Sequence, residues 1–191
     1  DVGKKFIAGL LHHAPEITLV TNQWINSYKR LVPGYEAPVY VSWAHVNRSD
    51  LVRVPAYKPG YESSVRVEYR APDPACNPYL ALSVMLTAGI KGIEEDYPIQ
   101  QPVAGDVSQM SDERRQSLGI KTLPSSLGEA IALAERVGVS PGQLLEVLRA
   151  GPGHSRALKL EDSNSLPLRE HLESGRIVQR NLRQCKLHSG V

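Results

Sequence analysis

Apolar and charged residues alternate without a break along residues 65–70. Successive side chains of a β-strand point to opposite sides of the sheet, so this alternation predicts a strand with one apolar face and one charged face. Because β-branched and aromatic residues suit a half-buried pleated surface, we expect the apolar face to pack on a core. The apolar face consists of Val65, Val67 and Tyr69, and the charged face of Arg66, Glu68 and Arg70.

The rest of the pattern predicts a mixture of strands and helices. Residues 40–46 and 51–55 have the composition of strands, and a short turn separates them. Apolar residues at helical spacing between Phe6 and Leu11 predict an amphipathic helix near the start of the chain. The almost wholly apolar run 79–86 predicts a core helix behind the sheet.

The polar positions of this region concentrate arginines. A loop over residues 26–38, marked by Pro33-Gly34 and Pro38, leads into the strands. Guanidinium groups bind anions through paired hydrogen bonds, and a carboxylate among them offers an oxygen ligand to a divalent cation. Such a cluster suits a phosphoryl-transfer pocket, where stabilisation of negative charge does most of the catalysis. The residues concerned are Arg30, Arg48, Arg53, Arg66 and Arg70, with Glu36 and Glu68 among them.

Two other interpretations of these charges stay open at this point. The charged face of residues 65–70 is also compatible with an exposed strand that carries ion pairs, which contribute little to stability. A nucleic-acid-binding surface would also contain clustered arginines. The chain has a single Phe and no basic run on one helix, so it offers few aromatic side chains on which bases could stack. The net charge of +2 indicates no particular partner.

Length and composition suit one globular domain or part of a larger one. The 191 residues include 41% hydrophobic and 22% charged side chains, which is ordinary for a globular protein. No stretch resembles a signal peptide or a membrane span, and the two cysteines make neither a disulfide framework nor a zinc motif. We therefore expect a cytoplasmic protein without membrane or nucleic-acid partners. Because the chain enters a helical pattern directly from Asp1, we also expect a truncated or excised segment.

Five motifs follow one another along the first 81 residues: His12-His13-Ala14-Pro15, residues 26–38, Asn47-Arg48-Ser49, residues 66–70 and residues 72–81. Together they resemble the C-terminal half of the catalytic domain of glutamine synthetase, bacterial type I class, over roughly residues 3–134. The resemblance implies an α+β fold with a curved, mainly antiparallel sheet backed by helices and a helical C-terminal region. Residues 1–134 would form the catalytic-domain portion, and residues 135–191 a divergent helical region with a basic tail.

The resemblance implies an ATP-dependent ligase of nitrogen metabolism. In this family ATP phosphorylates the side-chain carboxylate of glutamate, and ammonia then displaces phosphate from γ-glutamyl phosphate to give glutamine. Arg30 and Arg70 match positions that bind glutamate, and Arg66 matches one that faces the nucleotide. Arg48 and Arg53 match arginines that bind phosphate and the transferring group, which makes Arg48 a candidate catalytic residue. The implied cofactors are ATP and Mg²⁺ or Mn²⁺.

Two carboxylates complete the implied site. Glu36 matches a residue of a mobile flap that closes over glutamate and helps to deprotonate ammonium. Glu68 matches one metal ligand among several carboxylates and a histidine, and the others are expected upstream of Asp1. One carboxylate cannot hold metals that need about six oxygen ligands each, so we expect the isolated chain to be inactive. Family active sites form between subunits, and we expect a ring-shaped homo-oligomer for the full-length parent.

Three classes of function are therefore compatible with the sequence. They are an incomplete glutamate–ammonia ligase, a γ-glutamylamide synthetase acting on a larger amine, and a non-catalytic remnant or interaction module. The motifs do not separate ammonia from a larger amine, and they do not give the parent length, the oligomer size or the regulation. The adjacent pair His12 and His13, expected at a helix end, is interpreted as capping or packing rather than as a metal site.

Overall fold

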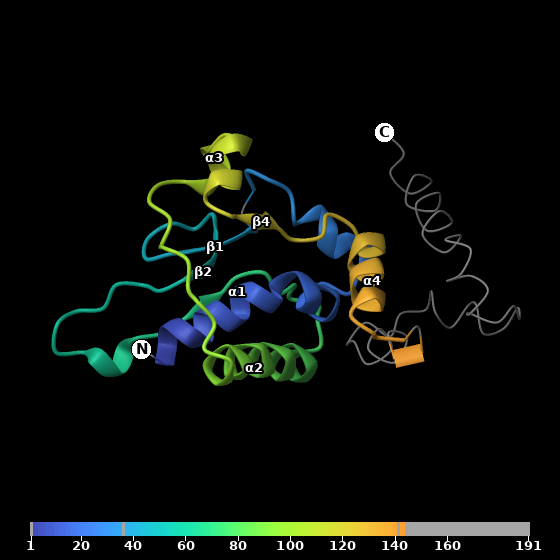
Figure 1. Cartoon of the computed structure of the whole chain (residues 1–191), viewed down its shortest axis with the longest axis horizontal. Coiled ribbons are helices and arrows are strands. Elements are labelled where there is room, and N and C mark those ends of the chain that lie inside the picture. The colour runs from blue at the N-terminus through green and yellow to red at the C-terminus, as the bar shows by residue number, and fades with distance from the viewer. Residues whose placement is uncertain (1, 36, 141, 144–191) are drawn as a thin grey trace, which may run out of the picture.

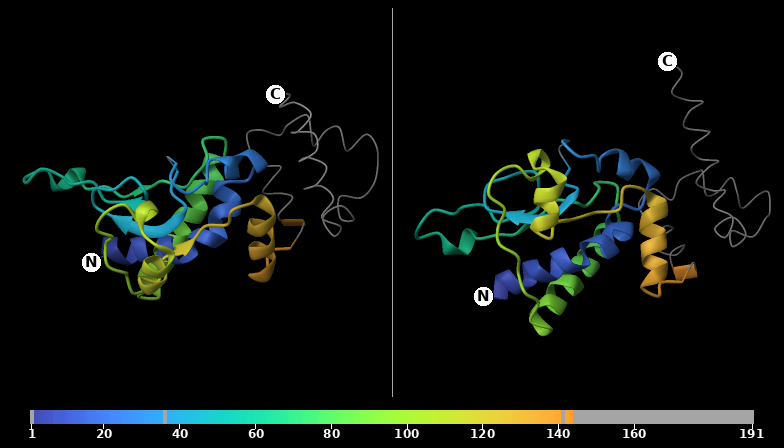
Figure 2. Two further views of the ribbon diagram at one scale, coloured as in Figure 1. Left: turned by 90° about the horizontal axis from the view of Figure 1, so that it is seen from above. Right: turned by 45° about the horizontal axis from the view of Figure 1, so that its top comes forward.

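The computed structural model describes residues 2–35, 37–140 and 142–143, which form one small sheet and two long helices with shorter elements around them (Figure 1). Helix α1 (Val2–Thr21) packs against the sheet on one side and against helix α2 (Pro78–Glu94) on another. Two further views show α1 and α2 running alongside each other (Figure 2). The hydrophobic core therefore lies where α1 meets the inner strands of the sheet.

The sheet has four strands in the order β3-β2-β1-β4. Their bounds are Tyr40–Ala44 for β1, Asp50–Arg53 for β2, Glu68–Tyr69 for β3 and Lys121–Thr122 for β4. The two inner strands are parallel, and each outer strand is antiparallel to its neighbour. Two of the three pairings are thus antiparallel, and the predicted α+β class with a mainly antiparallel sheet is confirmed.

Strand β1 is the most enclosed part of the sheet, since all of its residues are buried. The indole N–H of Trp43 donates to the carbonyl of Gln100 at 2.7 Å, and the side-chain amide of Gln100 donates to the carbonyl of Val41 at 3.0 Å. These bonds attach the segment after α2 to the centre of the sheet. Residues 45–49 return the chain from the end of β1 to the start of the parallel β2, so this connection is a loop and not a hairpin.

The predicted strand over residues 65–70 is much shorter in the structure. Val65 and Val67 are 48% and 37% exposed, so the expectation that they pack on the core is wrong. The reason is that backbone pairing with β2 begins only at Glu68, opposite Arg53. Residues 54–67 form a long connecting segment that projects from the sheet (Figure 1). Tyr69 alone of the apolar face packs against the core as expected.

Helix α1 is the amphipathic helix predicted near the start of the chain. Ile7, Leu10 and Leu11 belong to its buried side and to the hydrophobic core. Its contact with α2 is made through glycines, because a Cβ placed on Gly9 would lie 2.9 Å from the Cα of Gly92. No side chain separates the two helix backbones at this crossing.

Helix α2 forms where the apolar run 79–86 predicts a helix, but it does not lie behind the sheet. The side chain of Asn77 accepts hydrogen bonds from the backbone N–H groups of Tyr79 and Leu80, and Pro78 occupies the first turn. The expectation of a core helix behind the sheet is wrong, because α2 packs on α1 and leaves one face exposed. Apolar residues occur on all sides of α2, whereas α1 covers only one side of it.

Shorter elements complete the described part of the chain. They are the 3₁₀ helices η1 (Ile25–Lys29), η2 (Glu62–Ser64) and η3 (Val107–Gln109) and the α-helices α3 (Asp112–Ser117) and α4 (Leu127–Arg136). Most of the predicted region 135–191 lies outside the described residues, so the division after residue 134 stays a prediction. Within the described part, every helix is too short or too polar to pass through a membrane.

Candidate active site

Three charged side chains meet where β2 ends and β3 begins. The strand register places Arg53 opposite Glu68. Nε of Arg53 donates to Oε2 of Glu68 at 2.8 Å and Nη2 donates to Oε1 at 3.1 Å, so this contact is bidentate. Nε of Arg66 lies 3.4 Å from Oε1 of the same carboxylate. The antiparallel pairing thus brings together Arg53, Arg66 and Glu68, which we call the β2–β3 cluster.

The arginines of the β2–β3 cluster keep the Glu68 carboxylate charged. The hydrogen bond from Arg53 is the main cause that lowers the pKa of Glu68. Desolvation is the next largest effect and opposes it, and the positive charges of Arg53 and Arg66 add to the lowering. The side chain of Arg53 is only 23% exposed, whereas that of Arg66 is 61% exposed. Arg53 and Glu68 are therefore a fixed part of the sheet edge, and the Arg66 guanidinium stays accessible to an anion.

Two further arginines lie beside this strand pair. Arg70 directly follows β3, and its backbone N–H donates to the carbonyl of Leu51 at 3.0 Å. Arg30 comes from the end of η1, and its Nη1 donates to the carbonyl of Ala71 at 3.2 Å, a contact between residues 41 positions apart. The Arg30 side chain thus reaches the residue next to Arg70. The Arg30 guanidinium therefore lies against the backbone next to Arg70, and guanidinium groups suit the carboxylates of a ligand.

The other two predicted site residues are not joined to the β2–β3 cluster. Arg48 is exposed in the loop 45–49, and within the described part of the chain no hydrogen bond or ion pair engages its guanidinium. The loop itself is anchored, because the side-chain amide of Asn47 donates to the carbonyl of Gly105. Glu36 lies outside the described residues, so its place on a flap stays a prediction.

The described residues do not fit a metal site. Arginines already engage both oxygens of Glu68, so this carboxylate has at most one lone pair left to offer a cation. Across residues 2–35, 37–140 and 142–143 there is no group of three or more His, Cys, Asp or Glu side chains that could hold a metal ion. Glu68 therefore cannot form a Mg²⁺ or Mn²⁺ site with the residues described here alone.

One unusual carboxylate near the site is not singled out by the sequence. Asp50, the first residue of β2, is completely buried, and neither of its oxygens meets hydrogen-bond geometry with another described residue. Burial is the main cause that raises the pKa of Asp50, and the negative charge of Asp106 adds to it, while neighbouring polar groups and Arg70 oppose the shift. The only sequence signal for this residue is a charge at the start of an otherwise apolar strand.

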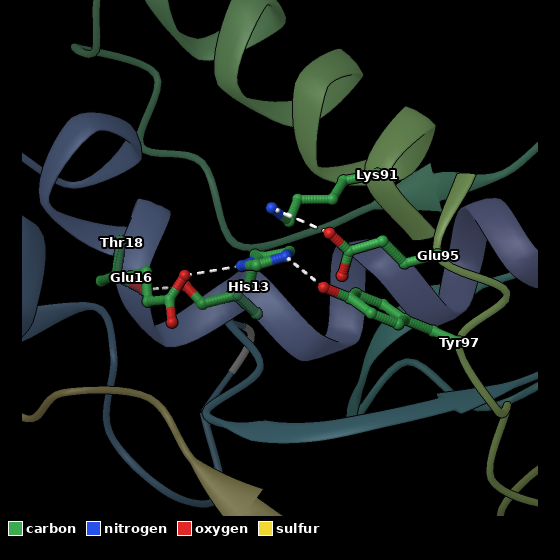
Figure 3. A network of polar contacts seen from close by, with 7 residues as sticks. His13, Glu16, Thr18, Lys91, Glu95 and Tyr97 are labelled. Atoms are coloured by element: carbon green, nitrogen blue, oxygen red, sulfur yellow. Dashed lines mark hydrogen bonds and ion pairs between the residues drawn. The ribbon is translucent and has the colours of Figure 1, made fainter. Parts of the chain in front are cut away.

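A second polar network lies between α1 and the segment that follows α2 (Figure 3). Nδ1 of His13 lies 2.6 Å from Oε2 of Glu16, and its Nε2 lies 3.4 Å from the hydroxyl of Tyr97. The ring of His12 packs on the same tyrosine, with a centroid distance of 4.5 Å. Packing is the role that the sequence favours for both histidines. Their expected position at a helix end is wrong, because α1 continues past Pro15.

An open cavity of about 520 Å³ lies next to His12, between α1, β4 and α4. Its ionisable lining residues are His12, Glu16, Lys121, Glu129 and Arg136. None of the arginines or carboxylates predicted for the site lines it. The candidate active site is therefore the surface around the β2–β3 cluster and not this cavity.

The residues of the candidate site lie within a region that is similar to known proteins. Residues 1–140 match the family model described as "Glutamine synthetase, catalytic domain". The chain is 53% identical over 135 residues to the glutamine synthetase of Mycolicibacterium smegmatis, which covers 71% of this chain and 30% of that protein. It is 50% identical over 136 residues to the glutamine synthetase of Pyrococcus furiosus, again with 71% and 30% covered. The chain thus spans about 30% of the length of the curated relatives it matches.

Proposed function

The chain belongs to the glutamine synthetase catalytic-domain family, and we propose that it carries part of an active site for the ATP-dependent ligation of glutamate and ammonia. The observation that carries this proposal is the β2–β3 cluster, in which Arg53 and Arg66 share the carboxylate of Glu68. The cluster lies within the matched residues, and its guanidinium groups suit anionic reactants. Because the chain spans about 30% of its relatives, the complete reaction is proposed for the full-length protein.

The proposed reaction has two steps. The γ-phosphoryl group of ATP is transferred to the side-chain carboxylate of glutamate, which gives ADP and γ-glutamyl phosphate. Ammonia then attacks the acyl carbon, phosphate leaves with the electron pair of the broken C–O bond, and the new amide nitrogen loses a proton. Negative charge builds up on phosphoryl oxygens in these steps, so fixed guanidinium groups lower the barriers.

The proposed role of each arginine is the one that the resemblance implies, and the surroundings of each side chain are compatible with it. The exposed Arg66 faces the nucleotide, and Arg53 and Arg48 bind the transferring phosphoryl group. The bidentate contact with Glu68 holds the Arg53 guanidinium in one orientation. No free energy is therefore needed to reorient this group when negative charge develops on the phosphoryl oxygens. Arg30 and Arg70 lie on adjacent stretches of backbone and bind the carboxylates of glutamate.

The remaining roles depend on parts of the protein beyond the described residues. Glu36 is proposed to close over glutamate and to accept a proton from ammonium, a contribution of about 10²–10⁴-fold for a general base. ATP with Mg²⁺ or Mn²⁺ is the proposed cofactor pair. Metal ligands other than Glu68 are proposed to come from the portion of the full-length protein that this chain does not span. The full-length protein is proposed to form a ring-shaped homo-oligomer.

A full-length chimera tests this function. In the M. smegmatis relative, the 135 matched residues are replaced by their counterparts from this chain, and glutamine formation from glutamate, ammonium and ATP is measured. Arg70→Ala should lower kcat/KM by about 10²-fold, because it removes charge-assisted hydrogen bonds to a glutamate carboxylate. Lys29→Ala, which removes an exposed cation of η1, is the matched control and should leave kcat/KM unchanged.

Four results would contradict the proposal. A chimera with the size and melting transition of its parent that forms no glutamine would show that this chain lacks the expected chemistry. Wild-type activity of Arg70→Ala would remove that residue from the site, and a collapsed melting temperature would give it a structural role. A chimera that prefers methylamine to ammonium would instead identify a γ-glutamylamide synthetase.

A further inference from the structure

Arg48 lies in a loop that contains neither helix nor strand. Its side chain is exposed, and within the described part of the chain its guanidinium makes no hydrogen bond or ion pair. The contact that holds this loop comes from the neighbouring residue, because the side-chain amide of Asn47 donates to the carbonyl of Gly105, 58 positions further along the chain. The position of the Arg48 backbone therefore depends on how firmly that carbonyl is held.

The segment that carries the acceptor carbonyl is fixed to strand β1 at two places. The backbone N–H of Val103 donates to the carbonyl of Trp43 at 2.9 Å. Nη1 of Arg115 donates to the carbonyl of Val107 at 3.1 Å. The same guanidinium lies 4.6 Å from the centre of the Tyr40 ring. The segment thus cannot shift without loss of its contacts with the most enclosed strand of the sheet.

The local backbone also sets the orientation of the acceptor. Gly105 has a φ of +89°, a conformation that glycine adopts without steric cost. Asp106 caps η3, since its side chain accepts hydrogen bonds from the backbone N–H of Ser108 at 2.9 Å and from the hydroxyl of Ser108 at 2.7 Å. The peptide group between Gly105 and Asp106, whose carbonyl meets Asn47, is therefore held on both sides.

We propose that Asn47 is a positioning residue for Arg48. Its bond to the fixed segment 103–108 holds the backbone of loop 45–49 and thereby keeps the Arg48 guanidinium at the transferring phosphoryl group. This role rests on the function proposed above, in which Arg48 binds that group. A shift of about 1 Å in a reacting arrangement can lower a rate by about 10²-fold, so the anchor matters even though one exposed hydrogen bond contributes little to stability.

A double-mutant cycle in the chimera tests the coupling of the two residues. Asn47→Ala should lower kcat by about tenfold and change the KM for glutamate by less than about twofold, because Arg48 is proposed to act on the phosphoryl group. In an Arg48→Ala background the same substitution should lower kcat by less than about twofold, because the side chain that it positions is gone. Val46→Ala, at an exposed position of the same loop, is the matched control and should leave kcat unchanged.

Hydrogen exchange of the 191-residue chain tests the anchor independently of the reaction. The backbone amides of residues 103 and 108–110 donate hydrogen bonds and therefore report on the segment. Asn47→Ala should speed their exchange by about fivefold, because one of the bonds that hold the segment is lost. The amides of α1 and α2 should exchange as in the wild type, and Val46→Ala should change neither region.

Unchanged exchange in Asn47→Ala would show that the bond does not hold this segment, and would overturn the proposal. An equal loss of kcat in both backgrounds would mean that Asn47 acts independently of Arg48, and a higher KM with unchanged kcat would place Asn47 in glutamate binding. A melting temperature lower by more than about 5 °C would make its role structural. Faster exchange together with wild-type kcat in Arg48→Ala would remove Arg48 from the proposed reaction, so that the anchor would stand without a catalytic role.

Discussion

Individual carboxylates of this protein are placed in opposite environments within one sheet. Glu68 lies at the partly exposed end of β3, where hydrogen bonds and charges of arginines lower its pKa. Asp50 starts the neighbouring β2 but is fully buried, so desolvation raises its pKa. Both residues lie a few positions from arginines in the sequence. Burial and hydrogen bonding, rather than sequence neighbours, therefore decide which carboxylate is stably ionised.

We predict that Asp50→Asn stabilises the 191-residue chain at neutral pH by about 1–3 kcal/mol, because it removes a negative charge from a fully buried position. The raised pKa means that the folded state keeps this proton to higher pH than the unfolded chain does. The wild type therefore loses stability as pH rises above about 4, up to the folded-state pKa. The advantage of the variant should grow over the same range, as measured by urea unfolding from pH 3 to 8.

Glu94→Gln, at an exposed position near the end of α2, is the control for that experiment. It changes the net charge in the same way without altering a buried group. A stability difference between wild type and Asp50→Asn that is the same at every pH would contradict the assignment, as would a variant that is less stable than wild type at pH 7.

Among the elements, the crossing of α1 and α2 is the most sensitive to side-chain volume. The crossing depends on Gly9 and Gly92, whose backbones approach without intervening side chains. Glycine in a helix interior costs about 1 kcal/mol relative to alanine when nothing else changes. Close packing at this point must therefore outweigh that loss.

We predict that Gly9→Ala destabilises the 191-residue chain by about 1–3 kcal/mol, because the added methyl group would overlap the carbonyl of Ala88 and the backbone of Gly92. Gly3→Ala is the matched control on the same helix, since a Cβ there meets nothing within 4 Å. It should stabilise the chain by up to about 1 kcal/mol. Chemical denaturation of the two variants gives both values, and equal signs would contradict the packing argument.

At the scale of the whole molecule, this chain contains arginines of the proposed site but no complete set of metal ligands among its described residues. It also covers about 30% of its relatives. The two facts agree, because a chain of this length can hold part of an active site whose other walls come from elsewhere.

We predict that the 191-residue chain forms no glutamine from glutamate, ammonium and ATP in the presence of Mg²⁺, whereas the chimera does. A single carboxylate cannot satisfy the roughly six oxygen ligands of the ion. Treatment of the chimera with EDTA should abolish the activity, and Mg²⁺ or Mn²⁺ should restore it. Glutamine produced by the 191-residue chain alone, and absent from a preparation of the Arg70→Ala chain, would disprove this prediction.

The sequence by itself determined the features that depend on near neighbours. Helical spacing predicts α1, the composition of residues 40–46 and 51–55 predicts β1 and β2, and the apolar run 79–86 predicts a helix where α2 lies. These follow because helix periodicity, strand composition and capping act over a few residues. The collinear motifs also predicted the family, which the comparison confirmed.

Only the tertiary structure decided which of these residues meet and which are covered. Arg53 and Glu68 join because two strands pair, and Val65 and Val67 are exposed because the same pairing stops at Glu68. Likewise α1, and not the sheet, covers α2. Pairing and burial depend on segments far apart in the chain, and a local pattern of apolar and polar residues contains no information on which segment will lie against it.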